Sequence, residues 1–109
     1  GQAEAIWGAA RAYLNDCHSR LWESAKTDLG VSVKDRIGVR LASTYAIRQA
    51  AEVVDIAYNI SGAGAIFAGN PVQRRFRDVH VITQQVQGQM YHYDTAGQFF
   101  LGLDPEGPM

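Results

Sequence analysis

The stretch Tyr58–Asp78 reads YNISGAGAIFAGNPVQRRFRD and separates two long helix-forming segments of this 109-residue chain. Gly62 and Gly64 can take positive backbone φ angles, and they leave no side chain between the main chain and an approaching group. Asn70 followed by Pro71 is typical of a helix N-terminus, because asparagine caps the first turn and proline is tolerated at the first helical position. We therefore predict an ordered connection between two helices, where an anion could bind.

Working outward from this connection, the sequence predicts an all-α fold in a single domain spanning residues 1–109. Three long helices at about 3–29, 32–61 and 71–87 should form an antiparallel, up-down bundle, followed by a short C-terminal helix. In the first helix, apolar residues recur at steps of three and four while charged residues fill the other face. Gly30 is its expected C-cap, and Ser32 is the expected N-cap of the second helix.

The second half of the second helix, residues 50–60, is apolar on nearly every face, which indicates a segment surrounded by protein. Three helices of one small chain cannot surround it, so we expect neighbours from a longer polypeptide or from other subunits. Buried carboxylates need partners. Arg48 stands four residues before Glu52 and is its expected partner, and an ion pair is also a better interpretation of Asp55 than catalysis.

Composition excludes several functional classes. The formal charge of −1 and the pI of about 6.3 predict no nucleic-acid partner and no attraction to anionic membranes. The single cysteine, Cys17, excludes an internal disulfide and lies on the apolar stripe of the first helix, so we expect it to be buried. No apolar run approaches the ~20 residues of a membrane span. We expect a cytoplasmic location, and we expect the chain to be the C-terminal part of a larger protein.

The histidines are the natural candidates for metal ligands or proton-transfer catalysts. His80 and His92 have no metal-ligand partner at helical spacing, and the sequence predicts no metal site. Each is expected to be a partly exposed helix residue with one hydrogen bond. The chain contains no phosphate-binding loop, dinucleotide fingerprint or nucleophile-elbow motif. The residues alone therefore indicate a helical bundle with a candidate anion-binding loop.

The patterns YNISGAG at 58–64 and NPVQRRFRDVH at 70–80 resemble the C-terminal helical domain of the acyl-CoA dehydrogenase superfamily. The resemblance is to the branch that includes two-component flavin-dependent monooxygenases, and it covers nearly the whole chain. It implies a four-helix bundle that builds an oligomer core and closes over the flavin. This chain would supply three of those helices and lack the first.

The resemblance also implies a cofactor site for FMN or FAD. Ser61, Gly62, Ala63 and Gly64 match the loop whose backbone approaches the flavin phosphate oxygens. Asn59 falls where the dehydrogenases have a cofactor-binding glutamine. This implication agrees with the backbone freedom expected of the glycines.

Two further positions distinguish the branches of the superfamily. The catalytic glutamate of the dehydrogenases would fall at Val86, and valine cannot remove a proton. In the monooxygenase branch a histidine often lies near the flavin, and the corresponding residue here is Gln85. Glutamine can donate a hydrogen bond but cannot shuttle a proton at neutral pH, so Gln85 is expected to position a reacting group.

The function implied is that of an oligomerisation and flavin-closing domain of a monooxygenase, also called a hydroxylase. Its small-molecule substrate would be aromatic, and a partner flavin reductase would supply the reduced flavin. A homo-oligomer, either a dimer or a tetramer, is expected, and the 109 residues by themselves should be inactive. The alternatives are an acyl-CoA dehydrogenase proper and a non-catalytic helical module that mediates self-association.

Overall fold

The computed structural model describes residues 1–62 and 70–104, and these form α-helices, one short 3₁₀ segment and no strand. The helices are α1 (Gln2–Ala25), α2 (Val33–Ser61), α3 (Pro71–Ile82) and α4 (Tyr91–Phe100), and η2 (Val86–Gly88) precedes α4. The prediction of an all-α fold is confirmed. Two residues of the predicted cofactor loop, Ala63 and Gly64, lie outside the described residues.

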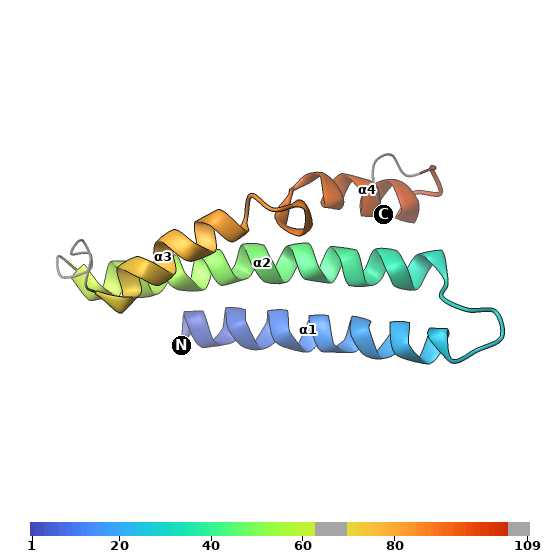
Figure 1. The fold of residues 1–109 in the computed structure, drawn as a ribbon, viewed down its shortest axis with the longest axis horizontal. Helices are drawn as coiled ribbons and strands as arrows, with labels where there is room; N and C mark the ends of the chain where they lie inside the picture. Colours follow the sequence, from blue (N-terminus) through green and yellow to red (C-terminus); the bar gives the residue numbers. More distant parts are fainter. Residues whose placement is uncertain (63–69, 105–109) are drawn as a thin grey trace.

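Helix α2 is the element that all the others contact. Helices α1 and α2 form an antiparallel hairpin, and α3, η2 and α4 follow one another along the other side of α2 (Figure 1). The helical segments after residue 70 therefore share α2 as their support. The structure contains, within the described ranges, no helix long and apolar enough to cross a membrane.

The core consists largely of small side chains, which lets the helices approach closely. Its buried hydrophobic residues are Ala10, Cys17, Ile37, Ala42, Ala51, Val79 and Ala96. The expected burial of Cys17 is thus confirmed. Large apolar side chains lie outside this core, and Trp7 and Ile60 are 50% and 81% exposed. The segment 50–60 is therefore not enclosed by the described part of this chain.

Both predicted N-caps are present. The backbone N–H of Asp35 donates to the Ser32 hydroxyl at 3.1 Å, and the N–H of Val72 donates to the Asn70 side chain at 2.8 Å. Pro71 is the first residue of α3, as expected. These caps satisfy N–H groups that the first turn of a helix leaves without backbone partners.

Helix α1 ends at Ala25 rather than at about residue 29, so the predicted C-cap Gly30 lies beyond it. The reason is local hydrogen bonding by Ser24. Its hydroxyl donates to the Gly30 carbonyl and accepts from the Ser32 N–H, both at 3.1 Å. Such bonds offer the backbone an alternative to the helix. Gly30 has a φ of 73° and forms the turn into α2.

Helix α3 ends at Ile82, five residues before the predicted end at Gln87. The Thr83 hydroxyl donates to the His80 carbonyl at 2.7 Å, and the Arg48 guanidinium donates hydrogen bonds to the carbonyls of Thr83 and Gly88. These bonds replace the helical hydrogen bonds that a longer α3 would need.

Arg48 does not pair with Glu52, so that prediction was wrong. Glu52 is exposed, while the Arg48 side chain is directed to backbone carbonyls some 40 residues away in sequence. Spacing along one helix could not reveal a partner contributed by another segment. Spacing does identify pairs within one helix: Asp16 and Arg20 stand four residues apart in α1, and their side chains lie 2.7 Å apart on its exposed face.

Gly88 provides a test of how tightly the turn before α4 packs on α2. An added Cβ at Gly88 would lie 2.8 Å from the Thr83 carbonyl oxygen and 3.1 Å from Ile47 Cγ2. We expect Gly88→Ala to lower the free energy of unfolding by about 1–3 kcal/mol through overpacking, measured by urea denaturation. The matched control is Gly97→Ala inside α4, where nothing lies within 4 Å of the added Cβ. It should be neutral or stabilising by up to about 1 kcal/mol. Equal effects of the two substitutions would contradict the packing described here.

Candidate functional site

The C-terminal end of α2 carries the described residues of the predicted cofactor loop. Gly62 caps the helix with a φ of 63°, and an added Cβ there would meet nothing within 4 Å, so its backbone is open to an approaching group. Asn59 is exposed. The Ser61 hydroxyl donates to the Ala57 carbonyl at 2.9 Å. Its proton is therefore not available to a ligand, but the Ser61 oxygen can still accept a hydrogen bond.

An open pocket of about 400 Å³ lies between the end of α2 and α3. It is lined by Asp55, Tyr58 and Asn59 from α2 and by Phe76 and His80 from α3. The volume falls within the range of small-molecule sites. The pocket therefore combines one predicted cofactor residue, Asn59, with an acid, a histidine and two aromatic rings.

Asp55 and His80 form an ion pair across this pocket when the histidine is protonated. Imidazole Nε2 lies 3.0 Å from Asp55 Oδ1, and both side chains are a little under half exposed. The structure gives Asp55 a histidine partner, and it confirms a single side-chain hydrogen bond for His80. The identity of the partner was missed, because 25 residues separate the two in sequence.

Gln85 lies in the turn between α3 and η2, not on α3 itself. It is exposed, and its backbone N–H donates to the Ile82 carbonyl at 3.0 Å. Gln85 is not among the residues that line the pocket between α2 and α3. The described structure thus does not bring Gln85 and Asn59 into one pocket.

The turn that carries Gln85 is held by side chains from two helices. From α2, Thr44 Oγ1 donates to the Gln87 carbonyl at 2.6 Å, and Arg48 Nε and Nη2 lie 2.7 and 3.3 Å from the carbonyls of Gly88 and Thr83. From α4, His92 Nε2 lies 2.5 Å from the Val86 carbonyl. The Gln84 carbonyl also accepts from Gln89 Nε2, at 2.6 Å. Five carbonyls of residues 83–88 therefore have side-chain donors, which fixes the turn without a regular helix.

His92 is buried, with 1% of its surface exposed, so the prediction of a partly exposed histidine was wrong. Its Nε2 donates a hydrogen bond to the Val86 carbonyl, and its buried Nδ1 has no hydrogen-bond partner among the described residues. A sequence signal existed: His92 shares a helical face with the buried residues Thr95 and Ala96, at spacings of three and four.

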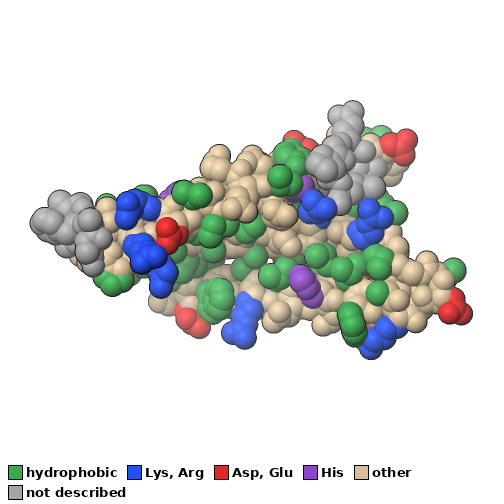
Figure 2. Space-filling view, in the orientation of Figure 1, with side chains coloured by type: hydrophobic (Ala, Val, Ile, Leu, Met, Phe, Trp, Pro, Cys, Tyr) green, Lys and Arg blue, Asp and Glu red, His purple; other side chains and the backbone are tan. Residues whose placement is uncertain are grey.

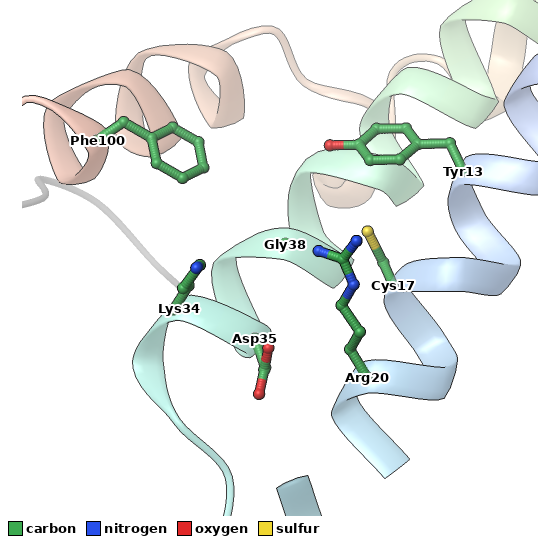
Figure 3. Close-up of a pocket in the computed structure, with 7 residues that line it drawn as sticks. All are labelled: Tyr13, Cys17, Arg20, Lys34, Asp35, Gly38 and Phe100. Carbon is green, nitrogen blue, oxygen red and sulfur yellow. The ribbon is translucent and has the colours of Figure 1, made fainter. Parts of the chain in front are cut away.

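A second pocket, of about 140 Å³, lies between the end of α1 and the start of α2. Figure 3 shows Tyr13 and Cys17 entering it from α1, Phe100 from α4, and Lys34 and Asp35 from the first turn of α2. Burial raises the pKa of the Cys17 thiol and of the Tyr13 phenol. A raised pKa lowers the thiolate fraction, so Cys17 is not an activated nucleophile.

Other candidate chemistry is limited. No group of three or more His, Cys, Asp or Glu side chains in the described part of the chain could hold a metal ion. Figure 2 shows basic side chains gathered over α3. The arginines at positions 74, 75 and 77 are exposed there, and Arg74 lies 3.8 Å from Asp78. The pocket between α2 and α3 is therefore the site best equipped for ligand chemistry.

Comparisons with known proteins give a family model and related enzymes. The family model described as the C-terminal domain of acyl-CoA dehydrogenase matches residues 1–89. An indole-3-acetate monooxygenase of Pseudomonas putida is 36% identical over 104 residues, which cover 95% of this chain. An indole-3-acetate monooxygenase of Acinetobacter baumannii is 28% identical over a stretch of the same length. The chain spans 27% of the length of each of these relatives.

The donors to the 83–88 turn can be tested by removing Arg48. Arg48→Met keeps an apolar side chain of similar length but leaves two carbonyls without a donor. We expect a loss of about 1–3 kcal/mol in the free energy of unfolding, and faster amide hydrogen exchange in residues 83–92.

Arg75→Met, on the exposed face of α3, is the matched control and should change the free energy of unfolding by less than about 0.5 kcal/mol. If Arg48→Met left both the stability and the exchange of this turn unchanged, the role given to the guanidinium would be wrong.

Proposed function

We propose a function for this chain from one premise: it belongs to the family of acyl-CoA dehydrogenase C-terminal domains, whose model covers residues 1–89. The proposal is that the chain is the C-terminal helical domain of a longer flavin-dependent monooxygenase. The observation that carries it is the 36% identity to an indole-3-acetate monooxygenase over 95% of this chain.

The residue at position 86 supports a monooxygenase over an acyl-CoA dehydrogenase. By resemblance, the dehydrogenases place their catalytic glutamate there. Val86 lies on η2 and is 53% exposed, and its aliphatic side chain cannot accept a proton. Oxidation of an acyl thioester needs a base for the α-proton, whereas oxygen transfer to an aromatic ring needs no such base at this position.

The end of α2 fits a flavin, either FMN or FAD. Asn59 is exposed and offers an amide that can both donate and accept hydrogen bonds. The backbone at Gly62 is open, and the Ser61 oxygen can accept. Ala63 and Gly64 belong to the same proposed contact by resemblance. When bound, the flavin would supply the activation of molecular oxygen, while these residues would bind and orient it.

Self-association is the second part of the proposal. A groove between α1 and α2 is lined mainly by apolar side chains, among them Trp7, Leu14 and Val53. Trp22 and Ile60 are further exposed apolar side chains on the same two helices. Covering these side chains would be favourable at about 25 cal/mol per Å². We propose that copies of the full-length protein cover them in a dimer or tetramer.

The proposed substrate is an aromatic compound of the indole-3-acetate class, taken from the names of the relatives. The resemblance adds a separate flavin reductase as the partner that supplies reduced flavin. A cytoplasmic location is also part of the proposal, and it rests on the composition of the chain. The isolated 109 residues would not turn over substrate, since most flavin and substrate contacts would lie in the preceding part of the protein.

The test is to supply the full-length protein with chemically reduced FMN or FAD, oxygen and indole-3-acetate. We expect a product heavier by one oxygen atom, detected by mass spectrometry. Reduction of the bound oxidised flavin by an acyl thioester, without oxygenation, would instead identify a dehydrogenase. Self-association with no flavin binding would favour the non-catalytic module.

The proposed subunit contact can be tested with a charge in the apolar groove. Val53→Asp should lower the solution mass of the full-length protein by at least a factor of two in light scattering, because burying the carboxylate in the contact would cost free energy even beside Arg11, which also lines the groove. Ala12→Asp introduces the same charge at an exposed position of α1 and is the control. An unchanged mass for Val53→Asp would remove this groove from the interface.

A further inference from the structure

We infer that Asp55 and His80 act together as a proton acceptor for an aromatic ligand bound between α2 and α3. The inference deepens the proposed function and rests on it, because the same pocket contains Asn59, the proposed flavin contact. The ligand class is an aromatic ring that carries an N–H or O–H group.

The geometry assigns a role to each imidazole nitrogen. Nε2 lies 3.0 Å from the Asp55 carboxylate, which has no proton to give when ionised, so Nε2 carries the hydrogen and donates it. Neutral imidazole then has its lone pair on Nδ1. No group in the described residues bonds Nδ1, which leaves it available to a ligand in the pocket.

Aromatic stacking holds the imidazole in place. The Phe76 ring centroid lies 4.6 Å from that of His80, and the Tyr58 ring lies 4.5 Å from Phe76. The imidazole is thus fixed by a carboxylate from α2 and by a ring from its own helix. Tyr58 and Phe76 also line the pocket, so they offer an aromatic ligand a surface on which to pack.

The charges around the pair favour this role. Asp55 and Tyr58 are the other titratable residues among those that line the pocket, and both come from α2. Elsewhere on α3, Asp78 lies 3.8 Å from Arg74. One carboxylate therefore faces the imidazole. It would stabilise the positive charge that the ring gains with a proton, as it does in other aspartate-histidine pairs.

The proposed step is a proton transfer and needs no further reactant. An aromatic ring that loses electron density to an electrophilic oxygen makes its N–H or O–H more acidic. That proton passes to His80 Nδ1, and the bonding electron pair stays on the ligand. The imidazolium is balanced by Asp55. Because both side chains are a little under half exposed, the proton can then leave to water.

The kinetic test uses the full-length protein with reduced flavin and indole-3-acetate. We expect His80→Gln to lower kcat by about 10²-fold or more, with flavin affinity within about twofold of the parent. The parent rate should rise with pH as the base loses its proton, and this limb should be absent in the variant. Asp55→Asn should also lower kcat, because an amide cannot balance the imidazolium charge.

His18→Gln, on the exposed face of α1, is the matched control and should keep both the rate and the pH profile. A pair that only braces α3 against α2 would change the free energy of unfolding but leave the pH profile intact. An unchanged profile in folded His80→Gln, with folding checked by circular dichroism, would overturn the inference.

A spectroscopic measurement separates this inference from the proposed function. In the ¹⁵N-histidine spectrum we expect His80 in the Nε2–H tautomer, and its Nδ1 resonance should shift when indole-3-acetate is added with oxidised flavin. If the protein does not hydroxylate, the proposed function fails, and the spectrum still decides the inference. Absence of the shift, or the opposite tautomer, would overturn it.

Discussion

The contact between the Arg48 guanidinium and the carbonyls of Thr83 and Gly88 is the constraint on which the path of the chain after α3 depends. Arg48 lies near the middle of α2, and its guanidinium donates hydrogen bonds to two carbonyls just after the point where α3 ends. Thr44 adds a donor to the Gln87 carbonyl one helical turn earlier. Because these acceptors are satisfied by side chains, the chain can leave the helix at Ile82, turn, and begin α4 against the same support.

The same face of α2 connects this turn to the candidate site. Thr44, Arg48, Ala51, Asp55 and Tyr58 follow one another at steps of three and four, so they form one stripe along the helix. The first two hold the turn, Ala51 is buried, and the last two line the pocket beneath α3. One stripe therefore fixes where α3 ends and what its histidine faces. The opposite side of α2 packs against α1 (Figure 1).

The sequence predicted what depends on near neighbours. The caps at Ser32 and Asn70, the exposed pair of Asp16 and Arg20, and the four α-helices were recognisable because caps and helical periodicity are local. It failed where the partner is distant. Arg48 was assigned to Glu52 by spacing, although its partners come 35 and 40 residues later. The Ser24 hydroxyl forms hydrogen bonds to the loop that follows α1, and the helix ends early as a result. Hydrophobic periodicity carries no information about such bonds.

The candidate site divides in the same way. Asn59, Ser61 and Gly62 could be selected from a motif, and the structure describes them at the exposed end of α2. The pairing of Asp55 with His80 could not be selected, because it depends on how α3 crosses α2. The sequence predicts an ion pair for Asp55 and one hydrogen bond for His80, but it does not relate the two residues. Their proximity to Asn59 emerged from packing alone.

Hydrogen exchange of the full-length protein, with and without bound flavin, tests the central claim that the end of α2 closes a flavin site. The account predicts slower exchange of the backbone amides of residues 59–62 when FMN or FAD binds, with α1 unchanged. Flavin binding that protects other parts of the protein and leaves residues 59–62 as exposed as before would contradict it.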